Sequence, residues 1–372
     1  MKIAIVTAVF APSSTPRALR ATELAKEFGK QGHSVTVFNC TKIVGDEPPA
    51  MENVEYIDLN IRTLSNKGVI TNIKRSKFTV KIFNCVKNVA FYWTLSTWMV
   101  YLRGLKNKFH SNEKYDLLIS IGLPFTIHWG ISTMFNGHNL ANCYVADYGD
   151  PFSMGNINIR VAKYFRIIEK RVINKFDYIS IPTEKALSTY KWLKPEDKIK
   201  IIPQGFNFDN VEIGTYTSND IPTFAYAGIF YPDIRNPKHL FEFLLSLEFD
   251  FRFVIYTTIS NSDSYSCILP YISKLKDKLV IKDFVPRKIL IKELSLMDFI
   301  INMNNLSTNQ VPSKLIDYAL SRRPIFSCSP NYLDGNEFVR FCSGNYEGQE
   351  KVDLNRHDIK SIVAQFCNLV KA

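Results

Sequence analysis

Glycine and proline are scarce in this sequence of 372 residues, with 16 and 17 copies, respectively. Combined with a hydrophobic content of 46%, this scarcity excludes a disordered or low-complexity chain and permits large hydrophobic cores. The seven cysteines include no Cys-x-x-Cys pair, and the apolar run Ile3–Val6 is too short to be the hydrophobic part of a secretory signal. We therefore expect reduced thiols and a cytoplasmic protein.

Acidic residues are absent between Leu59 and Asn112, although this segment contains ten Lys and Arg residues. The net charge of the whole chain is +11, so the rest of the sequence is close to neutral. A basic block of this kind indicates an anionic partner, either a membrane surface or nucleic acid. Since no nucleic-acid-binding motif accompanies the charge, we expect no nucleic-acid partner.

The same block contains an apolar and aromatic run, Val89–Leu102, between Lys87 and Arg103. The run is shorter than the roughly 20 residues that span a bilayer. Aromatic side chains flanked by cations suit the headgroup interface, whereas a buried core helix with a solvated basic edge is the alternative. We interpret residues 60–110 as a membrane-surface segment, which predicts a peripheral protein on the inner face of the cytoplasmic membrane.

Apolar runs alternate with helical patterns in the first half of the chain. The run Lys2–Thr7 has the continuous apolar character of a strand that is covered on both faces. Thr15 and Pro16 are typical of a helix start, and Gly32 is typical of its end. The further strands expected in this half are Ser34–Phe38, Asp116–Ile121, Asn142–Ala146, Asp177–Ile181 and Lys198–Ile202.

The same rhythm restarts after a polar segment, 208–222, which we interpret as an interdomain linker. The expected strands are Thr223–Ala227, Phe251–Thr257, Leu279–Phe284, Asp298–Met303 and Pro324–Ser327, and the expected helices are Pro237–Leu247, Arg287–Met297 and Ser313–Arg322.

This alternation predicts an α/β protein with two Rossmann-like, doubly wound domains that face a cleft. The first domain would comprise residues 1–207 and the second residues 223–355, with a C-terminal helix in 356–372 that packs back on the first domain. Ligands of open parallel sheets bind beyond the carboxyl ends of the strands, so we expect the functional residues there.

A helix start in the second half has the features of an anion site. After the strand Asp298–Met303 and a polar loop, Pro312-Ser313-Lys314 opens a helix. Free backbone N–H groups there could bind a diphosphate together with the Lys314 ammonium group. Asp317, one turn later, could accept hydrogen bonds from a ribose diol, which together describes a nucleotide diphosphate. An ordinary helix start with a solvated lysine remains the alternative.

A second unusual helix start carries Arg17 and Arg20 in its first turn. Cations there oppose the helix dipole and need an anion or solvent. An acceptor phosphate held by the preceding loop, which includes Ser13, is one explanation, and two solvated arginines are the other. The loop has no Gly-x-Gly-x-x-Gly pattern, which argues against a dinucleotide-dependent enzyme.

Several segments resemble the family 4 (group 1) glycosyltransferases of the GT-B fold. In the second half these are Tyr226-Ala227-Gly228, Ile234-Arg235-Asn236-Pro237 and the segment Val311–Ile325, which contains Pro-Ser-Lys-Leu. Pieces of the first half match in the same order: Glu23–Phe28, Gln31–Val37, Asp147–Pro151, Asp177–Ile179 and Ile201–Asn207. The resemblance covers most of the chain except about residues 60–110.

The resemblance implies roles for residues on the donor side. The family has two glutamates separated by seven residues, and these positions are Asn309 and Asp317 here. By resemblance, Asp317 would bind the ribose, whereas the sugar contact at Asn309 departs from the acidic pattern. The remaining implied donor contacts are Gly228, Arg235, Pro312, Ser313 and Lys314, of which Arg235 and Lys314 would also stabilise the leaving diphosphate.

On the acceptor side we expect Ser13, Arg17, His128 and Asp147, with Asp150 in a catalytic role at the end of a strand. A capping role for Asp150 and a structural role for His128 are the alternatives. The sequence has no Asp-x-Asp motif and no His pattern typical of a metal site, so we expect no metal and no cofactor besides the nucleotide sugar.

The predicted function is therefore a retaining, metal-independent glycosyltransferase. Its donor would be a nucleotide-diphosphate sugar, and its acceptor a saccharide, lipid-linked in bacterial surface polysaccharide synthesis. Two alternatives remain: a nucleotide-sugar 2-epimerase of similar fold, and a non-catalytic subunit that binds nucleotide sugar for a partner enzyme.

Overall fold

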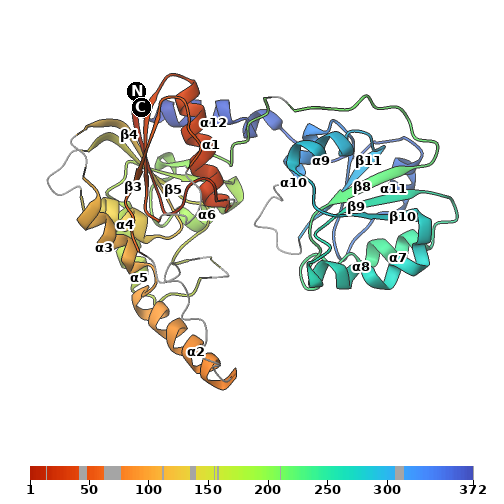
Figure 1. Cartoon of the computed structure of the whole chain (residues 1–372), viewed down its shortest axis with the longest axis horizontal. Coiled ribbons are helices and arrows are strands. Elements are labelled where there is room, and N and C mark those ends of the chain that lie inside the picture. The colour runs from red at the N-terminus through yellow and green to blue at the C-terminus, as the bar shows by residue number, and fades with distance from the viewer. Residues whose placement is uncertain are drawn as a thin grey trace. The chain divides into compact units, whose positions relative to one another are not determined.

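The computed structural model describes residues 1–13, 15–41, 48–62, 77–110, 113–134, 140–154, 156, 159–209, 211–305 and 314–371. The chain forms two compact units (Figure 1). The first comprises Met1–Asn207 together with Arg356–Ala372, and the second comprises Phe208–Asn355.

The first unit contains a seven-stranded sheet in which every neighbouring pair is parallel, in the order β3-β2-β1-β4-β5-β6-β7. The central strands are apolar at nearly every position because helices cover both faces of the sheet. The strands are β1 (Lys2–Thr7), β2 (Ser34–Asn39), β3 (Val54–Asp58), β4 (Tyr115–Ile121), β5 (Ala141–Asp147), β6 (Tyr178–Ile181) and β7 (Ile199–Ile201).

Two hydrophobic cores lie against this sheet. One contains Phe28 of α1 and Phe366 of α12, whose ring centroids are 6.5 Å apart. The other contains residues of α3, α4 and α5, such as Leu105, Ile131 and Phe165. The helices are α1 (Pro16–Lys30), α2 (Lys77–Thr94), α3 (Met99–Lys108), α4 (Thr126–Ser132), α5 (Phe165–Ile173), α6 (Leu187–Tyr190) and α12 (Ile359–Leu369).

The second unit contains a five-stranded parallel sheet in the order β10-β9-β8-β11-β12. Its strands are β8 (Thr223–Ala227), β9 (Arg252–Tyr256), β10 (Leu279–Lys282), β11 (Phe299–Met303) and β12 (Ile325–Cys328). Its helices are α7 (Lys238–Leu245), α8 (Ser262–Leu275), α9 (Arg287–Leu294), α10 (Lys314–Leu320) and α11 (Gly335–Cys342). The prediction of two parallel α/β sheets is confirmed.

The apolar run Val89–Leu102 forms two helices instead of one. Helix α2 ends at Thr94, Leu95 adopts a positive φ of 52°, and α3 begins at Met99. The buried Leu95 side chain anchors this break in the core, whereas Trp93 is exposed. The run therefore packs partly on the first unit and lies partly in solvent. Within the described part of the chain, no helix combines the length and apolar character needed to cross a membrane.

The segment expected to be a linker lies against the second unit. The Tyr216 hydroxyl donates a hydrogen bond of 2.7 Å to Asp298, and the Gly214 N–H donates one of 2.8 Å to the Ser295 hydroxyl. The guanidinium group of Arg323 stacks on the Tyr216 ring at 3.4 Å. These contacts fix residues 214–216 to the second unit.

Candidate functional site

The strand order of the second sheet reverses between β8 and β11. Such a switch point leaves a crevice at the carboxyl ends of the two strands, where open α/β sheets bind ligands. Gly228 follows β8 directly, and Asn304 and Asn305 follow β11. The predicted donor residue Gly228 therefore lies at the switch point.

Tyr318 ties helix α10 to this end of β8. Its buried hydroxyl donates a 2.7 Å hydrogen bond to the Ala227 carbonyl and accepts a 3.0 Å hydrogen bond from the Ala227 N–H. Because Asp317 precedes Tyr318 and Gly228 follows Ala227, these two bonds hold both predicted donor residues in the same region. Sequence reasoning did not single out Tyr318.

Arg235 also belongs to this region. Its Nε donates a 2.9 Å hydrogen bond to the Asn305 side chain, and its Nη1 lies 3.5 Å from the Tyr226 hydroxyl. The Tyr226 ring is buried and stacks on Phe230, with centroids 4.4 Å apart. The Arg235 guanidinium is therefore held between the ends of β8 and β11, the two strands at the switch point.

Two cations contact the Asp317 carboxylate, which is only 8% exposed. Arg287 Nε donates a 2.6 Å hydrogen bond to one oxygen, and Lys314 Nζ lies 3.5 Å from the other. Sequence reasoning missed Arg287, although a cation in the first turn of α9 is the same unusual signal that marked Arg17. The two cations and the one carboxylate leave a net positive charge in the first turn of α10, where an anionic ligand would be stabilised.

The other predicted donor contacts, Asn309, Pro312 and Ser313, lie outside the described residues.

In the first unit, the predicted acceptor residue Asp147 forms a buried ion pair with Arg20. Arg20 donates to both carboxylate oxygens, at 3.1 and 2.7 Å, and the Ser180 hydroxyl donates at 2.6 Å. Burial alone would raise the pKa of Asp147, but Arg20, with help from Arg17 and Ser180, lowers it. Asp147 therefore holds α1 to β5 and β6, and it supplies the anion that the first turn of α1 required.

Arg17 lies beside the same carboxylate, with Nη1 3.9 Å from Asp147 Oδ2. Its guanidinium group packs so closely on Gly149 that any side chain at that position would collide with it. The side chain is 24% exposed, so it is neither fully solvated nor fully buried. Asp150, partly buried, follows Gly149 in the same loop, and Ser13 bonds within its own loop through Phe10 and Thr15.

His128 is fully buried on α4. Its Nδ1 lies 2.8 Å from the Ser120 hydroxyl, and its ring lies against Tyr148, with centroids 4.8 Å apart. Burial lowers the pKa of His128 to about 3, so the imidazole is neutral near neutral pH. Its Nε2 has no hydrogen-bond partner within the described part of the chain and faces the close-packed Gly122.

Glu169 is a buried acid that sequence reasoning did not identify. One carboxylate oxygen accepts a 3.0 Å hydrogen bond from the Tyr148 hydroxyl, and the other accepts bonds from the backbone and hydroxyl of Ser153. Burial raises the pKa of Glu169 to about 7. Tyr148 and Ser153 flank the loop that carries Asp150, so Glu169 fixes this loop on α5.

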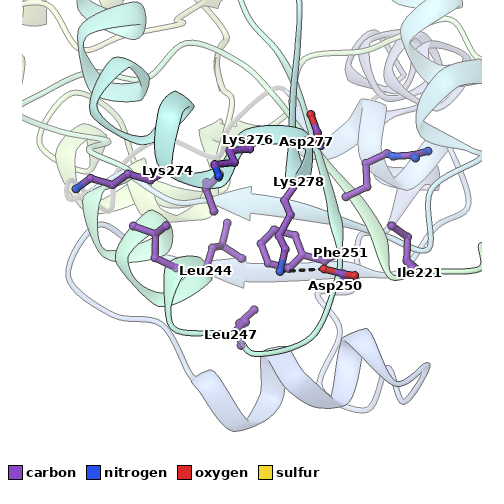
Figure 2. A pocket seen from close by; sticks show the side chains of 12 residues that line it. Ile221, Leu244, Leu247, Asp250, Phe251, Lys274, Lys276, Asp277 and Lys278 are labelled. Atoms are coloured by element: carbon purple, nitrogen blue, oxygen red, sulfur yellow. Dashed lines mark ion pairs between the residues drawn. The ribbon is translucent and has the colours of Figure 1, made fainter.

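A groove of about 540 Å³ lies elsewhere on the second unit (Figure 2). Its walls include Leu244 and Leu247 below Lys274 and Lys276, and Lys278 pairs with Asp250 at 3.1 Å. Phe251 and Ile221, which precede β9 and β8, also line the groove. It therefore lies at the amino ends of the strands, at the opposite edge of the sheet from Gly228, and we do not assign the donor site to it.

Among the described residues, no group of three or more His, Cys, Asp or Glu side chains is arranged to hold a metal ion. No protein-family model matches the sequence, and no curated protein matches it.

Solved structures match the chain over its whole length. It is similar to a sucrose-phosphate synthase from Thermosynechococcus elongatus, with 13% identity, a TM-score of 0.62 and coverage of 100% of this chain and 98% of that one. HepE from Anabaena in complex with UDP matches with 11% identity and a TM-score of 0.60, and a mutant of S. aureus TarM with UDP matches with 11% and 0.57, each covering 100% of both chains. At these identities the likeness establishes the architecture, and the chain therefore has the GT-B fold, with two parallel α/β units in one polypeptide.

Proposed function

We propose that this protein is a glycosyltransferase that moves a sugar from a nucleotide-diphosphate sugar to a saccharide acceptor. One observation carries the proposal: Arg235 lies at the switch point of the second sheet, and α10, which Tyr318 ties to the end of β8, carries Lys314 and the Asp317 that pairs with Arg287. An anionic ligand would bind there. Structures of the same fold support it, since HepE was solved with UDP and with UDP-glucose, and TarM with UDP.

The donor would bind with its diphosphate near Arg235 and Lys314 and its ribose on Asp317. Gly228 would allow the backbone to approach the phosphates, and the remaining contacts would come from Asn309, Pro312 and Ser313. The bond from the sugar to the phosphate breaks, a bond to the acceptor oxygen forms, and a departing phosphate oxygen takes the acceptor proton. Arg235 and Lys314 would stabilise the charge that develops on the leaving diphosphate, so that no metal is needed. The transferred sugar would retain its anomeric configuration.

The acceptor would bind to the first unit near the loop Asp147–Asp150. Arg17 and Asp150 are partly exposed and suited to direct contact, as is Ser13. Asp147 and His128 are buried in protein contacts, so in this proposal they position the loop beneath the acceptor rather than touch it. Asp150 would orient the acceptor hydroxyl.

The cellular setting proposed for this reaction is the inner face of a bacterial cytoplasmic membrane, with a lipid-linked saccharide as acceptor in surface polysaccharide synthesis. The basic and aromatic segment 60–110 motivates this setting, because a peripheral protein could reach a lipid-linked substrate from the cytoplasm.

A thermal-shift screen with nucleoside diphosphates and nucleotide sugars tests the donor site. A ligand at 100 times its Kd stabilises the folded protein by about 2.7 kcal/mol. Lys314→Ala and Asp317→Asn should abolish the shift. Lys238→Ala is the matched control, because Lys238 also begins a helix and pairs with an acid, Glu242, in the next turn. If both site variants keep the shift, the donor-site assignment is wrong.

Transfer itself is tested by incubating the protein with the nucleotide sugar that gives the largest shift and with a bacterial lipid extract. Radiolabel in the lipid fraction, lost in Lys314→Ala, is the expected result. Donor binding without any transfer would instead support a non-catalytic subunit, and conversion of the free nucleotide sugar into its epimer would support an epimerase.

A further inference from the structure

Helices α2 and α5 come from separate parts of the sequence, but the end of α2 meets the start of α5 in the first unit. The Tyr164 hydroxyl donates a hydrogen bond to the Trp93 carbonyl, and the Ala162 N–H donates one of 2.9 Å to the Tyr92 carbonyl. These bonds fix the start of α5 against the end of α2. Exposed side chains on either side of this junction therefore contribute to one surface.

Large hydrophobic side chains are exposed on both helices. On α2, Val86, Val89 and Trp93 recur at intervals of three and four residues, so they share one face, and each is more than half exposed. Figure 1 shows α2 projecting away from the sheet of the first unit. On α5, Ile167 is 57% exposed, and Tyr164 beside it is 42% exposed. Contiguous exposure of such residues marks an interaction site.

The cations on this surface lack acidic neighbours. Between residues 151 and 176 the sequence has one acid, Glu169, and its side chain is buried on the inner face of α5. Lys163, which precedes α5, and Arg166 and Lys170 of α5 are exposed, and none forms an ion pair with a described residue. The neighbouring α2 belongs to the acid-free stretch between Leu59 and Asn112. The fold thus joins two acid-poor segments.

We propose that this α2–α5 surface, defined by Val89, Trp93, Lys163, Arg166, Ile167 and Lys170, docks on an anionic lipid bilayer. Trp93 and Ile167 enter the headgroup region, and the three cations contact lipid phosphates. Exposed aliphatic and indole groups beside the cations favour a lipid partner over nucleic acid. A nucleic acid would contact the cations but would leave the aliphatic groups in water.

This inference names the membrane partner of the proposed function and rests on that function for its purpose, which is to bring the enzyme to a lipid-linked acceptor. The contact itself depends only on the surface side chains, so binding to lipid and binding to nucleotide can be measured separately.

Cosedimentation with vesicles tests the charge requirement. The full chain is expected to bind vesicles of phosphatidylcholine mixed with phosphatidylglycerol, and to bind pure phosphatidylcholine weakly. The triple variant Lys163→Gln, Arg166→Gln, Lys170→Gln should lower the partition coefficient on anionic vesicles roughly 100-fold, since each cation near such a surface is worth about fivefold. The control triple variant Lys274→Gln, Lys288→Gln, Lys351→Gln removes the same charge from exposed sites in the second unit.

Fluorescence quenching by brominated lipids tests insertion. Trp93 is the most exposed tryptophan among the described residues, so quenching should occur with anionic vesicles and should largely disappear in Trp93→Phe. The proposal fails if the two triple variants bind vesicles equally well, or if Trp93→Phe leaves quenching unchanged. It also fails if the α2–α5 surface causes self-association or nucleic-acid binding instead of lipid binding. The nucleotide thermal shift, measured on the same variants, should stay unchanged, which separates this proposal from the donor-site proposal.

Discussion

Replacing Glu169 with Gln is expected to make the stability of the first unit less dependent on pH. Burial raises the pKa of Glu169 to about 7, compared with an ordinary value of 4.5. The folded state therefore binds this proton more tightly than the unfolded state does. As the pH rises from 4.5 to 7, ionisation lowers the free energy of unfolding, and the loss is complete above about pH 7.

The magnitude follows from the difference between these two pKa values. A tenfold change in proton affinity is worth about 1.4 kcal/mol, so the full effect is about 3 kcal/mol. Between about pH 5 and about pH 8 the expected change is roughly 2.5 kcal/mol, because the unfolded chain has begun to ionise below this range. Gln cannot accept every bond that Tyr148 and Ser153 donate, but that cost is the same at both pH values and cancels in the comparison.

Urea unfolding monitored by tryptophan fluorescence measures this effect. The sequence has four tryptophans, and all lie in the first unit, so their fluorescence follows that unit alone. The free energy of unfolding of Glu169→Gln should gain about 2.5 kcal/mol relative to the wild type on going from about pH 5 to about pH 8. Glu184→Gln, at an exposed position, is the control. An unchanged difference between Glu169→Gln and the wild type would refute a buried, neutral carboxyl.

Three further predictions concern other residues of the two units. Tyr318→Phe leaves the Ala227 N–H and carbonyl unpaired, which should destabilise the second unit by about 1–3 kcal/mol in urea unfolding monitored by circular dichroism. Because burial lowers the pKa of His128 to about 3, the wild type should lose stability as the pH falls below 6.5, and His128→Asn should show a shallower loss in acid titrations. Arg287→Gln leaves Asp317 with one cation and should weaken nucleoside diphosphate binding roughly tenfold by calorimetry, whereas unchanged affinity would place Arg287 outside the donor site.

The sequence predicted the parallel strands well where they are buried on both faces. The strand Lys2–Thr7, for example, has the predicted bounds because its apolar run is continuous. β3 (Val54–Asp58) was not predicted, since this edge strand is half-exposed and contains acidic residues. Helix α8 was also missed, because Pro270 lies inside it and Pro normally signals a helix end.

The candidate site was harder to predict, because its contacts join residues that are distant in sequence. Arg20 at a helix start indicated that an anion was needed, but the partner, Asp147, is 127 positions away. Likewise, nothing in the local pattern pairs Arg287 with Asp317. Local sequence chemistry thus identified groups that need a partner, whereas the strand order of each sheet determined which partner they meet.

The packing of α12 on α1 has a consequence for how the chain is made. Phe366 and Ile362 complete a core that also contains residues of β1, β2 and β4. During synthesis this apolar face stays uncovered until α12 has left the ribosome, whereas all strands and helices of the second unit precede α12 and are available earlier. Of these two units, the one that begins to emerge second can thus be the first to finish folding. A premature stop codon just before Ile359 would release a protein with an intact second unit and an open first one, a substrate for chaperones and proteases.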